Sequence, residues 1–262
     1  VKMEQSQSES NPESNPMVSY EKTAKIKKWL FGIVGVAVLG IAASLWLPND
    51  DKEAKQAPKV KKIRTERNGV LKDTINGHEW VDLGLPSGTR WATYNVGAGS
   101  PEEFGDFYSW GETEPKSEYV DINSLTHRKD FKWLVKNGII NEDGELTNEH
   151  DAATTVWGEP WRMPTEEEFG ELIDLCEWQF TSYYGVNGYL VTGPNEQTLF
   201  IVAAGFQQGE EPEYVGEYGD YWTSTVVPEL IGASCSLGYS PKSYGRRRYA
   251  RFVGRSIRPV LD

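Results

Sequence analysis

A run of apolar residues with helical spacing marks one strong helix. Within residues 165–176 the apolar side chains recur at i, i+3, i+4 and i+7, at Phe169, Leu172, Ile173 and Cys176. Thr165 and Glu168 have the spacing of a capping box. Residues 166–168 are all glutamate, and their charge favours the positive end of the helix dipole. The pattern predicts a helix over 165–176, with structural rather than catalytic glutamates.

A second, shorter pattern predicts a helix over residues 129–136. Phe131, Leu134 and Val135 would face inward, and the Asn-Gly pair at 137–138 would end the helix.

After residue 176 the period changes to that of strands. Residues 189–192 and 198–203 are β-prone and flank the turn sequence GPNEQ, which predicts a hairpin. Four more short strands are predicted, over 221–226, 234–239, 247–253 and 256–260. Residues 76–113 combine turn-forming glycines, aromatics and carboxylates without either period, so we expect loops there, where binding sites tend to lie.

Residues 29–47 are uncharged and apolar. As a helix they would span about 28 Å, close to the thickness of the hydrocarbon layer. Trp29 and Trp46 lie at the two ends, and four lysines precede the run at positions 22, 25, 27 and 28. This predicts an uncleaved signal-anchor, with a cytoplasmic N-terminus and a periplasmic or otherwise extracytoplasmic C-terminal domain.

Two alternatives to the anchor are a cleaved signal peptide and a buried core helix. A signal peptide has a short charged start and a small-residue cleavage site, whereas 28 polar residues precede this run and Leu45, Trp46 and Leu47 end it. The expected organisation is therefore a disordered cytoplasmic tail (1–28), a transmembrane helix (29–47), a stalk (48–75) and a folded domain (76–262).

Composition and charge narrow the class of function. Of the 262 residues 38% are hydrophobic and 12% aromatic, including 10 Trp and 13 Tyr, enough for a substantial core. The net charge is −12, but residues 242–258 alone carry +7. The acidic remainder would repel phosphates, so we expect no nucleic-acid partner.

No catalytic pattern is recognisable. The three histidines, His78, His127 and His150, share no metal-binding spacing, and common nucleophile and phosphate-loop motifs are missing from the sequence. Neither Cys176 nor Cys235 has a basic neighbour in sequence that would activate its thiol. We therefore expect a protein that is not an enzyme. Whether the two cysteines pair stays open, because a disulfide needs α-carbons within about 7 Å.

Six strings across residues 76–262 resemble the Fibrobacter succinogenes major paralogous domain family, common in Bacteroidota. They are NGHEWVDLGLPSGTRWATYNVGA from Asn76, FGDFYSWGE from Phe104, DAATTVWGEPWRMPTEEEF from Asp151, GVNGYLVTGPN from Gly185, YWTST from Tyr221 and GRSIRPV from Gly254. The resemblance implies an α+β, C-type-lectin-like fold related to formylglycine-generating enzymes, with two helices, small twisted antiparallel sheets and long loops on one side.

The resemblance also bears on cofactors. Formylglycine-generating relatives use a pair of nearby cysteines, whereas Cys176 and Cys235 are far apart in sequence, so that chemistry is not expected. Lectin-like folds often bind calcium, but the sugar-binding triplet Glu-Pro-Asn is absent from the sequence. We expect no cofactor and no metal site. Calcium is the alternative, with two acidic clusters as candidate ligands, Glu210, Glu211, Glu213, Glu217 and Asp220, or Asn141, Glu142, Asp143 and Glu145.

In lectin-like folds of this group the C-terminal strands and loops form the binding face. Aromatic rings and guanidinium groups, which suit glycan or protein ligands, are interleaved there. The predicted ligand-binding residues are Trp222, Tyr239, Tyr244, Arg246, Arg247, Arg248, Tyr249, Arg251 and Phe252. Arg255 and Arg258, in the family-like ending, are interpreted as ordinary surface charge pairs.

The C-terminus also resembles in layout the regions that diversity-generating retroelements vary. On that hypothesis Cys235 is an incidental free thiol, and the exposed positions are Ser234, Ser236, Tyr239, Tyr244, Arg247, Tyr249 and Phe252. The sequence thus predicts a membrane-anchored recognition domain. A catalytic relative of formylglycine-generating enzymes and a structural component of an envelope complex are the alternatives.

Overall fold

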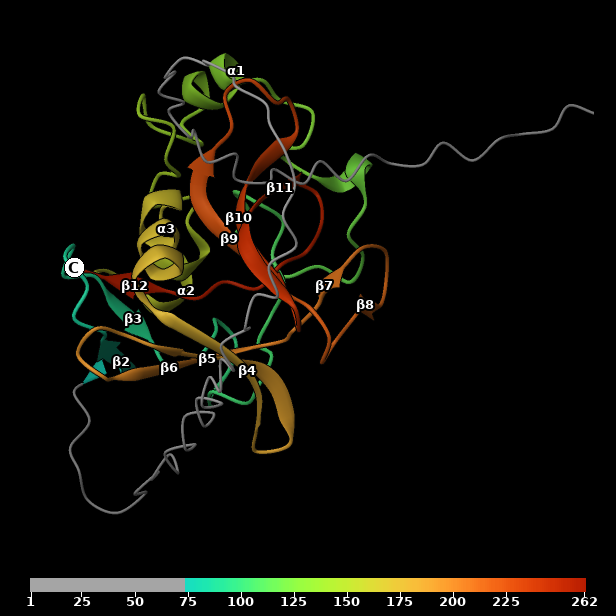
Figure 1. The fold of residues 1–262 in the computed structure, drawn as a ribbon. Helices are drawn as coiled ribbons and strands as arrows, with labels where there is room; N and C mark the ends of the chain where they lie inside the picture. Colours follow the sequence, from blue (N-terminus) through green and yellow to red (C-terminus); the bar gives the residue numbers. More distant parts are fainter. Residues whose placement is uncertain (1–73) are drawn as a thin grey trace, which may run out of the picture. The chain divides into compact units, whose positions relative to one another are not determined.

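Residues 74–262 are described by a computed structural model, and in them strands predominate over helices in an α+β arrangement (Figure 1). The predicted tail (1–28), membrane span (29–47) and all but the last two residues of the stalk (48–75) lie outside the described residues. In the described part of the chain, no helix has the length and hydropathy needed to cross a bilayer. Thr74 and Ile75 pair with the next strand, so the folded domain includes them.

Short elements make up this domain. The helices are η1 (Asp121–Asn123), α1 (Phe131–Lys136), α2 (Ala152–Trp157) and α3 (Glu166–Leu175). The strands are β1 (Thr74–Ile75), β2 (His78–Asp82), β3 (Arg90–Ala92), β4 (Glu177–Tyr183), β5 (Val186–Thr192), β6 (Thr198–Val202), β7 (Phe206–Gln207), β8 (Pro212–Glu213), β9 (Gly219–Val226), β10 (Ala233–Ser240), β11 (Ser243–Ala250) and β12 (Val260–Leu261).

The strong helix is confirmed as α3. The Thr165 hydroxyl accepts a hydrogen bond from the backbone N–H of Glu168, and the Glu168 carboxylate accepts one from the backbone N–H of Thr165. These reciprocal bonds satisfy two of the donors that a helix start leaves free. Phe169 and Leu172 are buried, and Cys176 caps the C-terminal end, so the apolar period was read correctly.

The shorter helix is also confirmed, as α1. It begins after Asp130, whose side chain accepts a hydrogen bond from the Trp133 backbone N–H, and it buries Leu134. Gly138 then adopts a φ of +71°, which ends the helix in a conformation that favours glycine. A third helix, α2, exceeds the two expected. It begins after Asp151, whose side chain accepts a hydrogen bond from the Thr154 backbone N–H, a cap that the sequence contains but that was not recognised as a helix start.

Antiparallel pairing dominates the sheets. The strand orders are β1-β2-β3-β12, β11-β10-β9, β4-β5-β6 and β7-β8. The predicted hairpin is β5–β6, which pairs Thr192 with Thr198. The predicted strands 221–226 and 234–239 lie within β9 and β10. The region 76–113 is mostly loop, but it contains β2 and β3, which were not predicted.

Two predicted strands need correction. The strand expected over 247–253 is β11, which begins at Ser243 and ends at Ala250 before a turn. The strand expected over 256–260 is an extended connection with isolated bridges, and only Val260 belongs to a strand. Pro259 has no N–H to give to a ladder, which limits regular pairing there.

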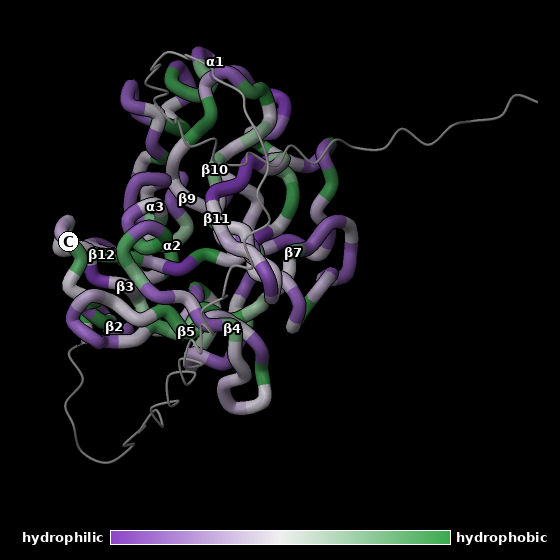
Figure 2. The backbone as a smooth tube through the Cα atoms, in the orientation of Figure 1, coloured by the Kyte–Doolittle hydropathy of each residue, from purple (hydrophilic) through white to green (hydrophobic). Residues whose placement is uncertain are grey.

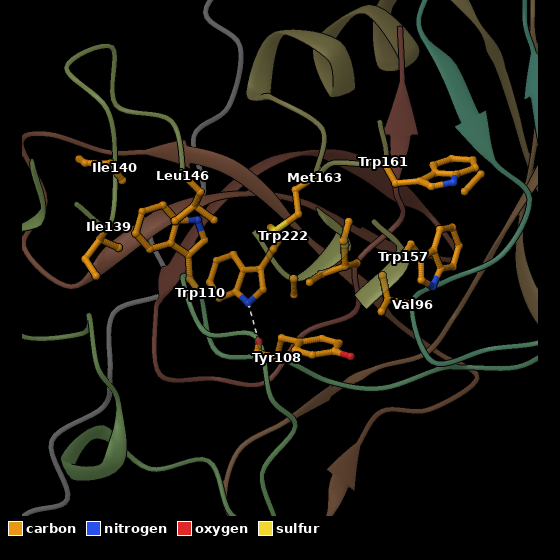
Figure 3. Close-up of a cluster of buried hydrophobic side chains, with 14 of the residues drawn as sticks. Val96, Tyr108, Trp110, Ile139, Ile140, Leu146, Trp157, Trp161, Met163 and Trp222 are labelled. Atoms are coloured by element: carbon orange, nitrogen blue, oxygen red, sulfur yellow. Dashed lines mark hydrogen bonds between the residues drawn. The ribbon is translucent and has the colours of Figure 1, made fainter. Parts of the chain in front are cut away.

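The sheet β9–β10–β11 has a hydrophobic core on each face. On the face covered by α3, Phe169 and Leu172 pack with Tyr221, Leu237 and Tyr239. On the other face lies a tryptophan-rich cluster, shown in Figure 3, which contains Trp110, Trp157, Trp161 and Trp222. Because β10 is the central strand of a sheet covered on both sides, its side chains are almost all buried.

The tryptophan-rich cluster is fixed by polar contacts as well as by packing. The Trp222 indole N–H donates to the Tyr108 carbonyl at 2.9 Å (Figure 3), and the Trp110 indole N–H donates to the Thr223 carbonyl at 2.8 Å. Figure 2 shows hydrophobic residues distributed in short stretches along the described chain, as expected where many short elements each contribute a few buried side chains.

Candidate ligand-binding surface

Strand β11 divides the three consecutive arginines between two faces of the sheet. Arg246 pairs with Leu237 of β10, Arg247 with Ser236 and Arg248 with Cys235. Successive side chains of a strand point to opposite faces. Arg246 and Arg248 therefore face α3, whereas Arg247 points to the other side, and the predicted nine residues do not form one surface.

The face toward α3 holds three of the predicted residues in structural contacts. The Arg248 guanidinium forms an ion pair with Glu166 at 2.6 Å, and the Cys235 thiol donates to the same carboxylate at 3.1 Å. Arg246 lies over Gly170 of α3, where an added Cβ would come within 1.7 Å of its guanidinium, but it is exposed, whereas Arg247 and Arg248 are partly exposed. Tyr244 stacks on Trp178, with ring centroids 4.6 Å apart.

Three other predicted residues are interior and do not form part of the exposed surface. Trp222, Tyr239 and Arg251 are all buried. Tyr239 donates to the Ile201 carbonyl at 2.7 Å, and Arg251 donates to the Ser234 hydroxyl at 2.9 Å. They lie in or beside a sheet that is packed on both faces, so we remove them from the binding surface.

Some of the positions that the retroelement hypothesis expects to be exposed are buried in the structure. Ser234, Ser236 and Tyr239 are buried because β10 is the central strand. Arg247, Tyr249 and two further positions, Tyr244 and Phe252, keep partial or greater exposure. Phe252 packs edge-on against His127 beyond the end of β11.

On the face away from α3, the structure brings together aromatic side chains and one arginine that the sequence did not group. We call this the tyrosine–arginine surface and define it as Phe206, Tyr214, Tyr218, Arg247 and Tyr249. Tyr214 is 51% exposed and Tyr218 41%. Tyr214 contacts Phe206 and Tyr218, with ring centroids 5.6 and 5.1 Å apart. Arg247 packs over Gly238 and forms no ion pair with another residue among 74–262.

A buried charge pair lies beneath this surface. The Arg255 guanidinium stands 3.9 Å from the Tyr249 ring centroid and 4.7 Å from that of Trp222. Its Nε lies 4.0 Å from an Asp220 carboxylate oxygen, too far for a hydrogen bond. Burial raises the pKa of Asp220 to about 6, although the positive charges of Arg255 and Arg247 act in the opposite direction. We call Asp220 and Arg255 the floor of the surface.

Arg255 and Arg258 lie in the interior rather than in the surface charge pairs that the sequence suggested, and hydrogen bonds hold Arg258 in place. Arg258 donates to the Asn95 side chain at 2.9 Å and to the Phe200 carbonyl at 3.0 Å. Burial lowers the pKa of both arginines. The family-like ending GRSIRPV therefore passes through the core and links separate segments of the chain.

Both cysteines are free thiols. Burial and the Glu171 charge raise the pKa of Cys176 to about 11. Burial raises the pKa of Cys235 strongly, and its hydrogen bond to Glu166 acts in the same direction. Neither environment favours the thiolate that nucleophilic chemistry requires.

The two acidic clusters considered for calcium are partly committed to other partners. Glu145 accepts hydrogen bonds from the Ser224 and Thr225 hydroxyls, and Asp220 faces Arg255. Within residues 74–262, no three His, Cys, Asp or Glu side chains are grouped so that they could hold a metal ion.

A separate open hollow of about 280 Å³ carries acidic groups. It is lined by Gly111, Glu112, Thr113, Glu114, Lys116, Leu125, Glu149 and His150. Glu112 is already paired with Lys116 at 2.5 Å, and the His150 ring contacts the Gly111 carbonyl at 3.0 Å. Of the three glutamates and one lysine in the hollow, Glu112 and Lys116 neutralise each other.

Of the predicted residues, Tyr244 and Arg246 are exposed and Arg247, Arg248, Tyr249 and Phe252 are partly exposed, but the sequence prediction missed Phe206, Tyr214 and Tyr218. The repeated tyrosines in EYVGEYGDY, residues 213–221, were the available signal. Comparisons of the chain with family models, with curated proteins and with solved structures give no match.

Proposed function

We propose that the domain is a non-enzymatic recognition module that binds a glycan or protein ligand through the tyrosine–arginine surface. The observation that carries the proposal is Arg247. It is a partly exposed guanidinium without an ion-pair partner among residues 74–262, and it lies on the same sheet face as the partly exposed Tyr249. Exposed tyrosine with arginine is the composition of binding hot spots.

The proposal includes a cellular setting. A helix over residues 29–47 anchors the chain in a bilayer and holds the domain on the periplasmic or other extracytoplasmic side, and the domain belongs to the C-type-lectin-like fold. The uncharged run of 29–47 and the family-like strings support these two statements. Deleting residues 29–47 should move the protein from the membrane to the soluble fraction. Retention in the membrane after the deletion would contradict the anchor.

The state of the thiols supports a binding role over formylglycine-type catalysis. A catalytic cysteine needs a lowered pKa and access to substrate. The pKa of Cys176 is raised to about 11, and Cys235 is buried beside Glu166. We also propose that no cofactor is needed, so chelation of calcium should leave binding unchanged.

Matched arginine variants test the surface. The full chain in detergent is screened on a glycan array and in pull-downs from an envelope extract, and the binding partner found is then titrated. Arg247→Ala or Tyr218→Ala should weaken binding at least tenfold, since arginine and tyrosine hot spots each contribute about 2 kcal/mol or more. Arg246→Ala is the control, because this neighbouring arginine lies on the opposite face, over Gly170.

Two outcomes would contradict the proposed surface. One is unchanged affinity in both Arg247→Ala and Tyr218→Ala. The other is a larger loss in Arg246→Ala than in Arg247→Ala, which would place the ligand on the face toward α3.

A further inference from the structure

The floor of the tyrosine–arginine surface has hydrogen-bonding capacity that the described residues leave unfilled. The Nε and Nη1 atoms of Arg255 are buried and have no hydrogen-bond partner. The Ser236 hydroxyl, on the same face of the central strand, is buried without a partner as well. Asp220 supplies an acceptor 4.0 Å from Arg255 Nε. Buried donors of this kind are costly unless a partner fills them.

The two floor residues carry opposite charges, so a ligand charge of either sign meets one repulsion there. A carboxylate or phosphate would be attracted by Arg255 and Arg247 but repelled by Asp220, and an ammonium group would be attracted by Asp220 but repelled by the two arginines. A hydroxyl group suits both, because it accepts a hydrogen bond from a guanidinium and donates one to a carboxylate. Two neighbouring hydroxyls could satisfy both side chains without placing a third charge beside the pair.

The aromatic rings around the floor require that the ligand also present an apolar surface. The rings of Phe206, Trp222 and Tyr249 surround the Arg255 guanidinium, at 5.7, 4.7 and 3.9 Å from centroid to carbon. Tyr214 and Tyr218 extend the aromatic surface outward. A sugar ring matches this combination, since its C–H face packs on aromatic rings while its hydroxyls form hydrogen bonds.

We propose that the ligand is a neutral sugar ring, which directs two adjacent hydroxyls toward Asp220 and Arg255 and rests on the aromatic rings. The inference rests on the proposed function, and it narrows the ligand class from glycan or protein to neutral glycan. Only 3% of the Arg255 side chain and 5% of the Asp220 side chain reach solvent. Tyr249, which is partly exposed and contacts Arg255, is the side chain that turns aside to admit the hydroxyls.

Matched sugars and a nearly isosteric variant test the inference. The full chain in detergent is titrated with methyl glycosides of glucose, galactose and mannose, with the corresponding uronates, and with glucosamine, and binding is followed by saturation-transfer NMR. A neutral glycoside should bind at least tenfold more tightly than its uronate. Asp220→Asn should weaken the neutral glycoside at least tenfold and reduce the discrimination against the uronate, because the repelling charge is removed.

The change in discrimination separates a ligand contact from a structural role. A merely structural Asp220 would, on substitution, weaken the glycoside and the uronate in proportion. Circular dichroism and a melting curve confirm that the variant folds. Arg246→Ala, on the opposite face of the sheet, serves as the control and should retain binding of the neutral glycoside.

Each outcome distinguishes this inference from the proposed function. The inference is overturned if no neutral glycoside binds at tens of millimolar, if uronates bind as well as neutral glycosides, or if Asp220→Asn leaves their ratio unchanged. If Arg247→Ala still abolishes binding of an array or pull-down ligand in those cases, the proposed binding surface is retained. Only the proposal that the floor binds a neutral sugar is then rejected. When Arg247→Ala has no effect either, the proposed function fails with it.

Discussion

The buried Asp220 should make the stability of the domain depend on pH in a way that Asp220→Asn removes. Burial raises its pKa from the ordinary 3.8 to about 6 in the folded protein. Between these values the folded state binds more protons than the unfolded state, so the free energy of unfolding falls as pH rises through this window. The two pKa values differ by about 2, and at about 1.4 kcal/mol for each pKa unit the loss is about 3 kcal/mol.

Urea unfolding of the wild-type chain and of Asp220→Asn in the same detergent, at pH 4, 5, 6 and 7, measures this effect. Asp151 and Glu145, whose pKa values burial raises, titrate in both proteins and cancel in the difference. Between pH 4 and pH 7, where the unfolded carboxyl is already more than half ionised at the start, the wild type should lose about 2.5 kcal/mol relative to the variant. Loss of the partner of Arg255 lowers the stability of the variant by a nearly constant amount, because that arginine stays protonated throughout.

Parallel stability curves for the two proteins would refute the reasoning. A wild type that instead gains stability relative to Asp220→Asn as pH rises would mean that attraction by Arg255 outweighs burial. The sign of the difference therefore decides which of the two effects dominates at a separation of 4.0 Å.

Three further predictions concern the framework. Thr165→Ala removes the side-chain cap of α3 and should lower the free energy of unfolding by about 1 kcal/mol, measured with a denaturant. The control Glu167→Ala, at an exposed position, should change it by less than about 0.5 kcal/mol. Equal effects of the two substitutions would count against the capping box. Trp222→Phe removes the buried indole hydrogen bond and should lower the unfolding free energy by about 2 kcal/mol, visible as a shift in the urea midpoint. At pH 8 a thiol reagent should label folded Cys176 about 100-fold more slowly than an ordinary thiol, and Cys235 more slowly still. In urea both thiols should react at the ordinary rate. Rapid labelling of the folded chain would contradict the raised pKa values.

The sequence by itself determined the elements whose signals are local. The cap and apolar spacing of α3 lie within twelve consecutive residues, and the β5–β6 hairpin is set by its turn. The end of α1 follows from Gly138, which takes a positive φ. In each case the residues that decide the structure are neighbours along the chain, so their pattern can be read without knowledge of the fold.

Only the tertiary structure decided which C-terminal residues meet solvent. The same arginine-rich string supplies exposed Arg246 and partly exposed Arg247 to the surface, Arg248 to an ion pair with α3 and Arg251 to the interior. Strand alternation assigns each side chain to a face, but contacts with distant segments, 82 residues away for Arg248 and 125 for Arg251, determine which side chains are covered. The candidate site likewise joins residues from β7, the loop after β8, β9 and β11, because sheet pairing brings distant parts of the chain together and their sequence spacing carries no record of it.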